Sequence, residues 1–262
     1  MCPEKLNQPA VLKDINDIVS NFSAVSLDEI NEVKLMSRID RKYWFHFSKL
    51  APLLENALDD YDILEINGQR VMDYQTTYFD TPDSSMYIKH HNQKLNRVKI
   101  RQRNYVSTNN SFLEVKFKTN KKRTVKTRIA TNFGPSGFIQ TELEFIDKKT
   151  PFKGEELQPS LNNKFKRITL IHKQKLDRCT IDINPEFWDE NGKSKIENLV
   201  IFEVKRGKSL KLSPIVTILR NLKIRQKGLS KYCTGRAILD HKLKQNAFKR
   251  RLNFITKKIN QN

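Results

Sequence analysis

The stretch that decides the fold is Arg97-Val98-Lys99-Ile100-Arg101-Gln102-Arg103, in which a cation stands at every second position. Side chains two residues apart in a β-strand share a face. The four cations of this stretch therefore point to one side of a strand, and Val98 and Ile100 point to the other. The stretch predicts a strand with one charged face and one apolar face.

The same alternation recurs along the chain, in Arg38-x-Asp40-x-Lys42, Glu114-x-Lys116-x-Lys118, Lys126-x-Arg128, Glu142-x-Glu144, Arg178-x-Thr180-x-Asp182 and Glu203-x-Lys205. An antiparallel sheet with one face in water would explain any single strand of this kind. Cations dominate these faces, however, and like charges on one strand face repel each other. A bound polyanion would offset that repulsion. If the apolar faces turn outward to helices, the sheet can curl into a barrel with a charged lumen.

The overall charge agrees with an anionic partner. The 262 residues contain 49 Lys and Arg against 29 Asp and Glu, a formal net charge of +20. Such an excess indicates nucleic acid, an acidic membrane surface or a phosphate compound. Three widely spaced cysteines argue against a disulfide framework or a zinc knuckle. Without a signal peptide or an 18-residue apolar run, we expect a cytoplasmic protein that is at most peripheral to the inner face of a membrane.

The sequence pattern predicts strands over residues 35–47, 61–66, 70–79, 95–105, 112–118, 122–130, 138–146, 164–172, 175–183 and 196–205. Helices are expected over residues 11–19, 49–58, 82–91, 210–222 and 231–244, with a capping box at Ser26 and Glu29. Asn67-Gly68 predicts a hairpin turn, and residues 150–163 a loop. We expect an N-terminal extension over residues 1–25, one strand-rich domain over 26–240 and a basic helical tail over 241–262.

An ordered set of motifs gives residues 32–240 a family resemblance. In chain order the motifs are Arg41-Lys42-Tyr43, Tyr78-Phe79-Asp80-Thr81-Pro82, Tyr87 with His90, Arg97-x-Lys99-x-Arg101-x-Arg103-x-Tyr105, Phe112-Leu113-Glu114-Val115-Lys116, Lys126-x-Arg128, Arg167, Arg178-x-Thr180-x-Asp182, Phe202-Glu203-Val204-Lys205 and Ser230-Lys231-Tyr232. The set resembles the VTC domain, the polyphosphate polymerase module of the CYTH, or triphosphate tunnel metalloenzyme, superfamily. The resemblance implies an α+β fold, an eight-stranded antiparallel β-barrel with helices packed outside.

The resemblance also implies site residues. The catalytic phosphate ligands would be Lys42, Arg101, Arg103, Lys116, Arg167, Arg178 and Lys231. Substrate-binding candidates beside them are Arg97, Lys99, Lys126, Arg128, Lys205 and Lys227. Glu203 would be the main ligand of a divalent metal, manganese or magnesium, with Glu114 as a second. In phosphoryl transfer the protein mainly positions groups and stabilises charge, so ligand geometry matters more than a dedicated base.

One departure bears on the reaction. Tunnel triphosphatases begin with Glu-x-Glu-x-Lys, where this chain has Arg38-x-Asp40-x-Lys42. The loss of a carboxylate favours a polymerase that transfers the terminal phosphate of ATP to a growing polyphosphate chain. The alternatives are a tunnel-type inorganic or nucleoside triphosphatase and a non-catalytic polyanion-binding module.

The other partners and flanking signals are less defined. We expect ATP and polyphosphate as ligands, no specific nucleic-acid recognition, and a membrane protein or an anionic membrane surface as a further candidate partner. His90 and His91 are candidates for phosphate contact or for a helix-capping role. Gly228 stands where the family often has Lys, so Lys227 beside it is the candidate there. We expect a stand-alone module.

Overall fold

The computed structural model describes residues 15–32, 38–121, 123–134, 137–207 and 213–259. The strands are β1 (Ala24–Val25), β2 (Arg38–His46), β3 (Tyr61–Leu64), β4 (Met72–Asp80), β5 (Arg97–Tyr105), β6 (Asn110–Lys118), β7 (Thr124–Ala130), β8 (Gln158–His172), β9 (Asp177–Asp189), β10 (Gly192–Lys195) and β11 (Leu199–Gly207). The helices are α2 (Leu27–Glu32), α3 (Leu50–Glu55), α4 (Ser85–His91), α5 (Gln140–Lys149), α6 (Pro214–Asn221), α7 (Lys231–Leu239) and α8 (Lys249–Phe254), which η4 (Ile255–Ile259) continues. Residues 15–20 are also helical.

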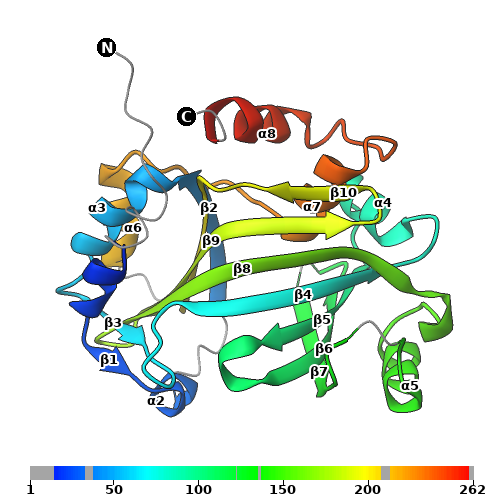
Figure 1. Ribbon diagram of the computed structural model, residues 1–262, viewed down its shortest axis with the longest axis horizontal. Helices are drawn as coiled ribbons and strands as arrows, with labels where there is room; N and C mark the ends of the chain where they lie inside the picture. Colours follow the sequence, from blue (N-terminus) through cyan, green and yellow to red (C-terminus); the bar gives the residue numbers. More distant parts are fainter. Residues whose placement is uncertain (1–14, 33–37, 122, 135–136, 208–212, 260–262) are drawn as a thin grey trace.

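One curled antiparallel sheet forms the centre of the molecule, with the strand order β2-β11-β9-β8-β4-β5-β6-β7 (Figure 1). The strands β3 and β10 pair with β8 and β9, and β1 pairs in parallel with β3. Within the described ranges, no ladder joins the end strands β2 and β7. The predicted α+β fold, an eight-stranded antiparallel β-barrel with helices packed outside, is confirmed in the form of a half-barrel, a curled antiparallel sheet of eight strands with helices outside it.

The outer face of the sheet is apolar and is covered by helices. Phe202 and Val204 of β11 pack with Ile181 of β9 in a core that also takes in Leu53 of α3 and Leu219 of α6. Figure 1 shows α3 and α6 together at one end of the sheet. Because apolar residues alternate with charged ones on these strands, covering the outer face leaves the charged side chains on the other face. We call that other face, which carries Lys42, Arg101, Arg167 and Glu203, the interior face.

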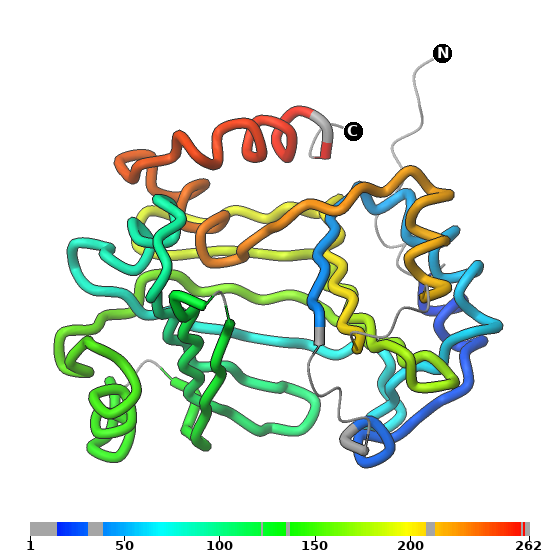
Figure 2. Tube along the Cα trace, turned by 180° about the vertical axis from the view of Figure 1, so that it is seen from behind, coloured from blue at the N-terminus to red at the C-terminus, as the bar shows by residue number. Residues whose placement is uncertain are grey.

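The helix α7 lies against one end of the interior face. Tyr232 and Ala237 of α7 join a second core with Leu161 of β8 and Phe187 of β9. Gly235 permits this approach, since a Cβ atom there would lie 2.5 Å from Cδ1 of Phe187 and 2.7 Å from Cδ2 of Leu161. The end of the interior face beside α7 is therefore filled by apolar side chains. Figure 2 shows the segment before α7, in orange, passing β2, where Gln226 forms a bridge with Tyr43.

The predicted strand over residues 138–146 is wrong, because these residues belong largely to the helix α5. Glu142 is buried and its Oε2 accepts the backbone N–H of Ile139 at 3.1 Å, which caps the first turn. Ile146, one helical turn later, is fully buried. Glu142 therefore caps a helix, and Glu144 lies on the exposed surface of the same helix. Neither residue is an interior-face carboxylate.

Three other predictions about elements differ from the structure. The Asn67-Gly68 turn exists, with positive φ at both residues, and an isolated bridge between Ile66 and Gln69 closes it. The strands β3 and β4 do not form the predicted hairpin ladder with each other, because both pair with β8. The predicted loop over residues 150–163 is shorter than expected, because β8 already begins at Gln158. The first residues of β8 pair with β4. The helix expected over residues 231–244 ends at Leu239. Parts of the segments predicted over 1–25, 35–47, 210–222 and 241–262 lie outside the described residues.

No helix in the described ranges is long and apolar enough to cross a membrane.

Candidate functional site

The strand register aligns charged residues across the interior face. Lys116 of β6 lies between Lys99 of β5 and Lys126 of β7. One step along, Glu114 lies between Arg101 and Arg128. Towards the opposite edge of the same sheet, Glu203 of β11 lies between Lys42 of β2 and Thr180 of β9. Paired residues in a sheet share a face, so the parity that the sequence predicted is confirmed for these strands.

Glu114 is the centre of a first ion-pair cluster. Its Oε2 accepts Nε of Arg101 at 2.7 Å and lies 2.6 Å from Nη2 of the same guanidinium. Its Oε1 contacts the ammonium of Lys126. Burial raises the pKa of Glu114, but Arg101, Arg103 and Lys126 lower it more, so the net pKa lies well below its ordinary value. Glu114 is therefore an ionised, buried carboxylate held between two cations.

Glu203 is the centre of a second cluster. Its Oε1 accepts the ammonium of Lys42 at 2.6 Å, and its Oε2 lies 3.2 Å from Nζ of Lys205. Burial raises the pKa of Glu203, while Lys205 and Lys42 lower it more, so this carboxyl is also ionised. The two lysines come from different strands, β2 and β11. The ion pair between Glu203 and Lys42 therefore links β11 to the edge strand β2.

Asp182 is the centre of a third cluster, which the sequence did not predict as a site residue. Arg167 donates Nε to Oδ1 at 2.6 Å and Nη2 to Oδ2 at 2.9 Å, a two-point fork. The ammonium of Lys231, from α7, contacts the same Oδ2 and lies 4.1 Å from the ring centre of Phe165. The parity of Arg178-x-Thr180-x-Asp182 could have revealed Asp182, because it places the carboxylate on the same face as Arg178.

Three further interior cations, Lys99, Arg103 and Lys116, form no ion pair with a carboxylate within the described ranges. Lys99 donates its ammonium to Oγ of Ser230 at 2.9 Å, and Nε of Arg103 lies 3.4 Å from Oγ1 of Thr76. For Lys116, the described part of the chain shows no ion pair at all. The positive charge nearby lowers the pKa of Lys116 well below its ordinary value, with Arg101 the largest cause and burial the next. The interior face thus holds more cationic groups than it neutralises.

Electrostatic effects show that cations from distant strands lie near one another. Burial lowers the pKa of Lys99 to about 8, and Lys42 on the opposite end strand adds to that lowering. Burial also lowers the pKa of Lys231 to about 7, against the opposing effect of Asp182, while Arg167 and Arg103 lower it further. Since a nearby cation favours the neutral form of lysine, β2, β5, β8 and α7 place their cations around one space.

Four more of the predicted site residues can be placed relative to the interior face. Arg97, Arg128 and Lys227 contact groups at its margin, and Arg178 lies in register with it. Arg97 donates Nη1 to the backbone oxygen of Lys94 at 2.6 Å, and the guanidinium of the exposed Arg128 lies 4.3 Å from the ring centre of Phe112. Nζ of Lys227 lies 4.6 Å from the ring of Phe254 and 5.0 Å from that of Trp44. Arg178 is the register partner of Lys205 on the interior face.

The two adjacent histidines have different surroundings. His91 is buried, and its Nε2 accepts the backbone N–H of Ala247 at 3.1 Å, which attaches α4 to the segment before α8. Burial, Lys99 and Arg97 lower the pKa of His90 to about 2, so His90 is neutral at physiological pH. The contact of His91 supports a structural role for that residue.

A divalent metal is the cofactor that the resemblance implies, and Glu203 suits it better than Glu114. The described residues contain no group of three or more His, Cys, Asp or Glu side chains that could hold a metal by themselves. Magnesium commonly binds through one or two carboxylates together with substrate phosphates. The side chain of Glu203 is 19% exposed, whereas that of Glu114 is fully buried. Glu203 therefore fits a metal that arrives with phosphates, and Glu114 fits an ion pair.

Solved structures with a similar fold share little sequence with this chain. A protein from Hippeastrum, described as a candidate adenylyl cyclase with a dominant triphosphatase activity, is 13% identical, with a TM-score of 0.49 over 77% of this chain and 96% of that chain. A candidate adenylate cyclase from Bacillus halodurans is 15% identical, with a TM-score of 0.47 over 74% of this chain and 96% of that chain. A search of curated proteins found no match.

The family comparison is more direct, because it concerns the segment that builds the interior face. The family model described as the VTC domain matches residues 37–240. The matched range begins at the start of β2 and ends just after α7, so it contains Lys42, Glu114, Asp182, Glu203 and Lys231. With most of the chain matched and all three ion-pair clusters inside the match, this protein belongs to the VTC domain family.

Proposed function

We propose that this protein is a metal-dependent polyphosphate polymerase, which transfers the terminal phosphate of ATP to a growing polyphosphate chain bound on the interior face. The observation that carries the proposal is the surplus of positive charge on the interior face, above all at the half-buried Lys116. A cation that is partly removed from water without a counter-ion is costly. A phosphate chain would supply the missing negative charge at Lys99 and Lys116, which lie in one row with Lys126.

The cations of the interior face suit two ligands placed end to end, the triphosphate of ATP and the terminus of a polyphosphate chain. In the transfer, an oxygen of the terminal phosphate of the chain forms a bond to the γ-phosphorus of ATP, and the bond between that phosphorus and the β,γ-bridging oxygen breaks. ADP leaves, and the chain is one phosphate longer. Arg101, Arg103 and Lys116 would neutralise charge on the transferred group, because fixed cations in a poorly hydrated site stabilise such charge effectively. A divalent metal bound with ATP at Glu203 would neutralise phosphate charge further.

The protonation states favour transfer to phosphate over hydrolysis. Glu114, Asp182 and Glu203 each contact two cationic side chains, and in each case the net pKa is lowered. A carboxylate with a low pKa is a poor base for activating water. The terminal phosphate of a polyphosphate chain is already anionic and needs no base to act as a nucleophile. These three residues therefore serve a polymerase better than a triphosphatase.

The test is to incubate the purified protein with ATP and Mn²⁺ and to measure polyphosphate and orthophosphate. We expect long polyphosphate from the unchanged protein. Glu203→Gln should reduce synthesis at least about ten-fold, because it removes a metal ligand and leaves Lys42 and Lys205 without their shared carboxylate. Glu197→Gln is the matched control, since Glu197 pairs with Lys195 at an exposed site and should have no effect.

The other outcomes identify the rival functions. Release of orthophosphate without polymer would contradict the proposal and indicate a triphosphatase. Tight binding of polyphosphate with no turnover, unaffected by Glu203→Gln, would indicate a non-catalytic polyanion-binding module.

A further inference from the structure

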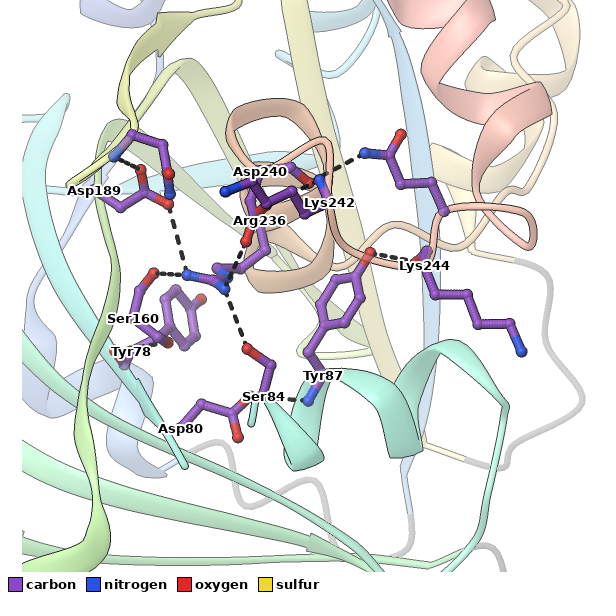
Figure 3. A network of polar contacts seen from close by, with 12 residues as sticks. Tyr78, Asp80, Ser84, Tyr87, Ser160, Asp189, Arg236, Asp240, Lys242 and Lys244 are labelled. Atoms are coloured by element: carbon purple, nitrogen blue, oxygen red, sulfur yellow. Dashed lines mark hydrogen bonds and ion pairs between the residues drawn. The ribbon is translucent and has the colours of Figure 1, made fainter. Parts of the chain in front are cut away.

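A buried polar network fixes α7 to the rest of the fold, outside the three ion-pair clusters. Figure 3 shows Arg236 of α7 at its centre. Nη1 of Arg236 donates to the backbone oxygen of Ser160 at 2.8 Å, and Nη2 donates to Oγ of Ser84 at 3.2 Å. The same guanidinium lies 3.6 Å from Oδ2 of Asp189 and 3.3 Å from Oδ2 of Asp240. One side chain therefore joins α7 to β8, to β9 and to the start of α4.

Asp80 forms the second half of the network. It is fully buried at the end of β4, and its carboxylate accepts the backbone N–H groups of Met86 and Tyr87 at 2.9 Å each. The same carboxylate also accepts the hydroxyl of Tyr232, from the first turn of α7. Burial, and then the nearby Asp80, raise the pKa of Tyr232 well above its ordinary value, so this hydroxyl stays protonated and donates. Asp80 thus connects α4 to the first turn of α7.

The first turn of α7 is also the part that reaches the interior face. Lys231 precedes Tyr232 directly and contacts Asp182. Ser230, the N-cap of α7, accepts the ammonium of Lys99 and the backbone N–H of Cys233. The ring of Tyr232 packs 5.1 Å from that of Tyr78. A shift of this turn would move Ser230 and Lys231 relative to Lys99 and Asp182 together.

We propose that Tyr232, Asp80 and Arg236 are positioning residues that hold Ser230 and Lys231 at the phosphate-binding face. This inference rests on the proposed function only as far as phosphate binding, and it does not require polymerisation. The hydroxyl of Tyr232 acts through Lys231: it fixes the turn from which the ammonium projects, and it does not contact the ligand itself. The effect of losing the hydroxyl should therefore depend on whether Lys231 is present.

The experiment is a double-mutant cycle, with tripolyphosphate binding measured by calorimetry in the absence of metal. Tyr232→Phe removes the hydroxyl and keeps the ring. We expect it to weaken binding by about five- to ten-fold, which is less than a hydrogen bond to a charged group is worth, because the hydroxyl acts on the ligand only through Lys231. In a Lys231→Met background the same change should weaken binding less than about two-fold, because coupled residues are not additive.

A matched control separates positioning from general stability. Tyr61 is a buried tyrosine whose hydroxyl donates to Asp177 at 3.1 Å, in the outer core. Tyr61→Phe should lower the Tm but leave the Kd for tripolyphosphate unchanged. Ser84→Ala, which removes one contact of Arg236, is a milder second variant. It should weaken binding in the same direction as Tyr232→Phe, and again only when Lys231 is present.

Three results would overturn the inference. These are an unchanged Kd in Tyr232→Phe, an equal loss in the presence and absence of Lys231, and a comparable loss in Tyr61→Phe. Failure of the unchanged protein to bind tripolyphosphate would overturn both this inference and the proposed function. Binding with the expected coupling but no polymer from ATP would contradict the proposed function alone.

Discussion

Lys116 is crowded by positive charge and has no carboxylate partner among the described residues, whereas its neighbour Glu114 has two cations. Arg101 and burial lower the pKa of Lys116 well below its ordinary value. Lys116 is half-buried, and replacing a partly desolvated, uncompensated charge with an apolar group of similar length removes a desolvation cost. Such residues are retained where a ligand uses them, at the expense of the stability of the free protein.

We predict that Lys116→Met stabilises the free protein and weakens phosphate binding. Unfolding free energy should rise by about 1 kcal/mol, which raises the Tm by about 2–4 °C for a chain of this size. Glu114→Gln should do the opposite to stability, because it leaves Arg101 and Lys126 without their counter-ion. Thermal melts and tripolyphosphate titrations of both variants measure this, and a destabilised Lys116→Met variant would contradict it.

At the scale of single residues, the sequence predicted which face of a strand a side chain lies on, but not which groups that side chain contacts. Parity correctly placed Arg101, Lys116 and Glu203 on one face. It could not show that Arg97 turns back to Lys94, or that Lys227 packs on Trp44 and Phe254, because those contacts depend on turns and on α8.

At the scale of elements, α7 depends on close contact with the sheet. The Cβ of any residue larger than glycine at position 235 would overlap the side chains of Phe187 and Leu161. Both side chains are fully buried, so they cannot move away without disturbing the core.

We predict that Gly235→Ala lowers the unfolding free energy by about 1–3 kcal/mol, the usual cost of overpacking. Urea denaturation measures the change. Gly228→Ala is the control, because a Cβ atom at position 228 would meet nothing within 4 Å. Equal stability of the two variants would show that α7 does not pack as described.

Elements with long, unambiguous alternation could be predicted, and the short ambiguous one could not. In β5 a cation stands at every second position from Arg97 to Arg103, and the sheet confirms this strand. Residues 138–146 alternate over a shorter range, where the spacing of Glu142 and Ile146 also suits a helix. The capping contact of Glu142 with Ile139 decides in favour of the helix, and only the three-dimensional structure shows it. The role of Asp80 as the link between α4 and α7 also needed the structure, because its partner Tyr232 lies 152 residues away.

At the scale of the whole molecule, the surplus charge makes stability and binding respond to pH in opposite directions. Burial lowers the pKa of Lys231 to about 7 and of Lys99 to about 8, from 10.5. Between these values and 10.5, the unfolded chain binds more protons than the folded chain. Stability therefore rises with pH across this window, and the destabilising effect is fully present below it.

We predict that the Tm of the free protein rises between about pH 7 and pH 9, while its affinity for tripolyphosphate falls, because the anion binds the protonated lysines. Lys231→Met should reduce both slopes, and this comparison removes the contribution of the titrating ligand, which is common to both proteins. A Tm that falls over this interval, or slopes unchanged by Lys231→Met, would contradict the prediction.

The pairing of β2 with β11 also sets the order in which the molecule can assemble. The bond between Lys42 and Glu203 joins residues 161 positions apart in the chain, and Lys231 lies further still towards the C-terminus. Contacts of such long range slow folding. On the ribosome, β2 has no partner strand until β11 emerges, and the third cluster stays incomplete until α7 follows. We therefore expect that a nascent chain completes the three ion-pair clusters, and with them the proposed phosphate-binding face, only after α7 has left the ribosome.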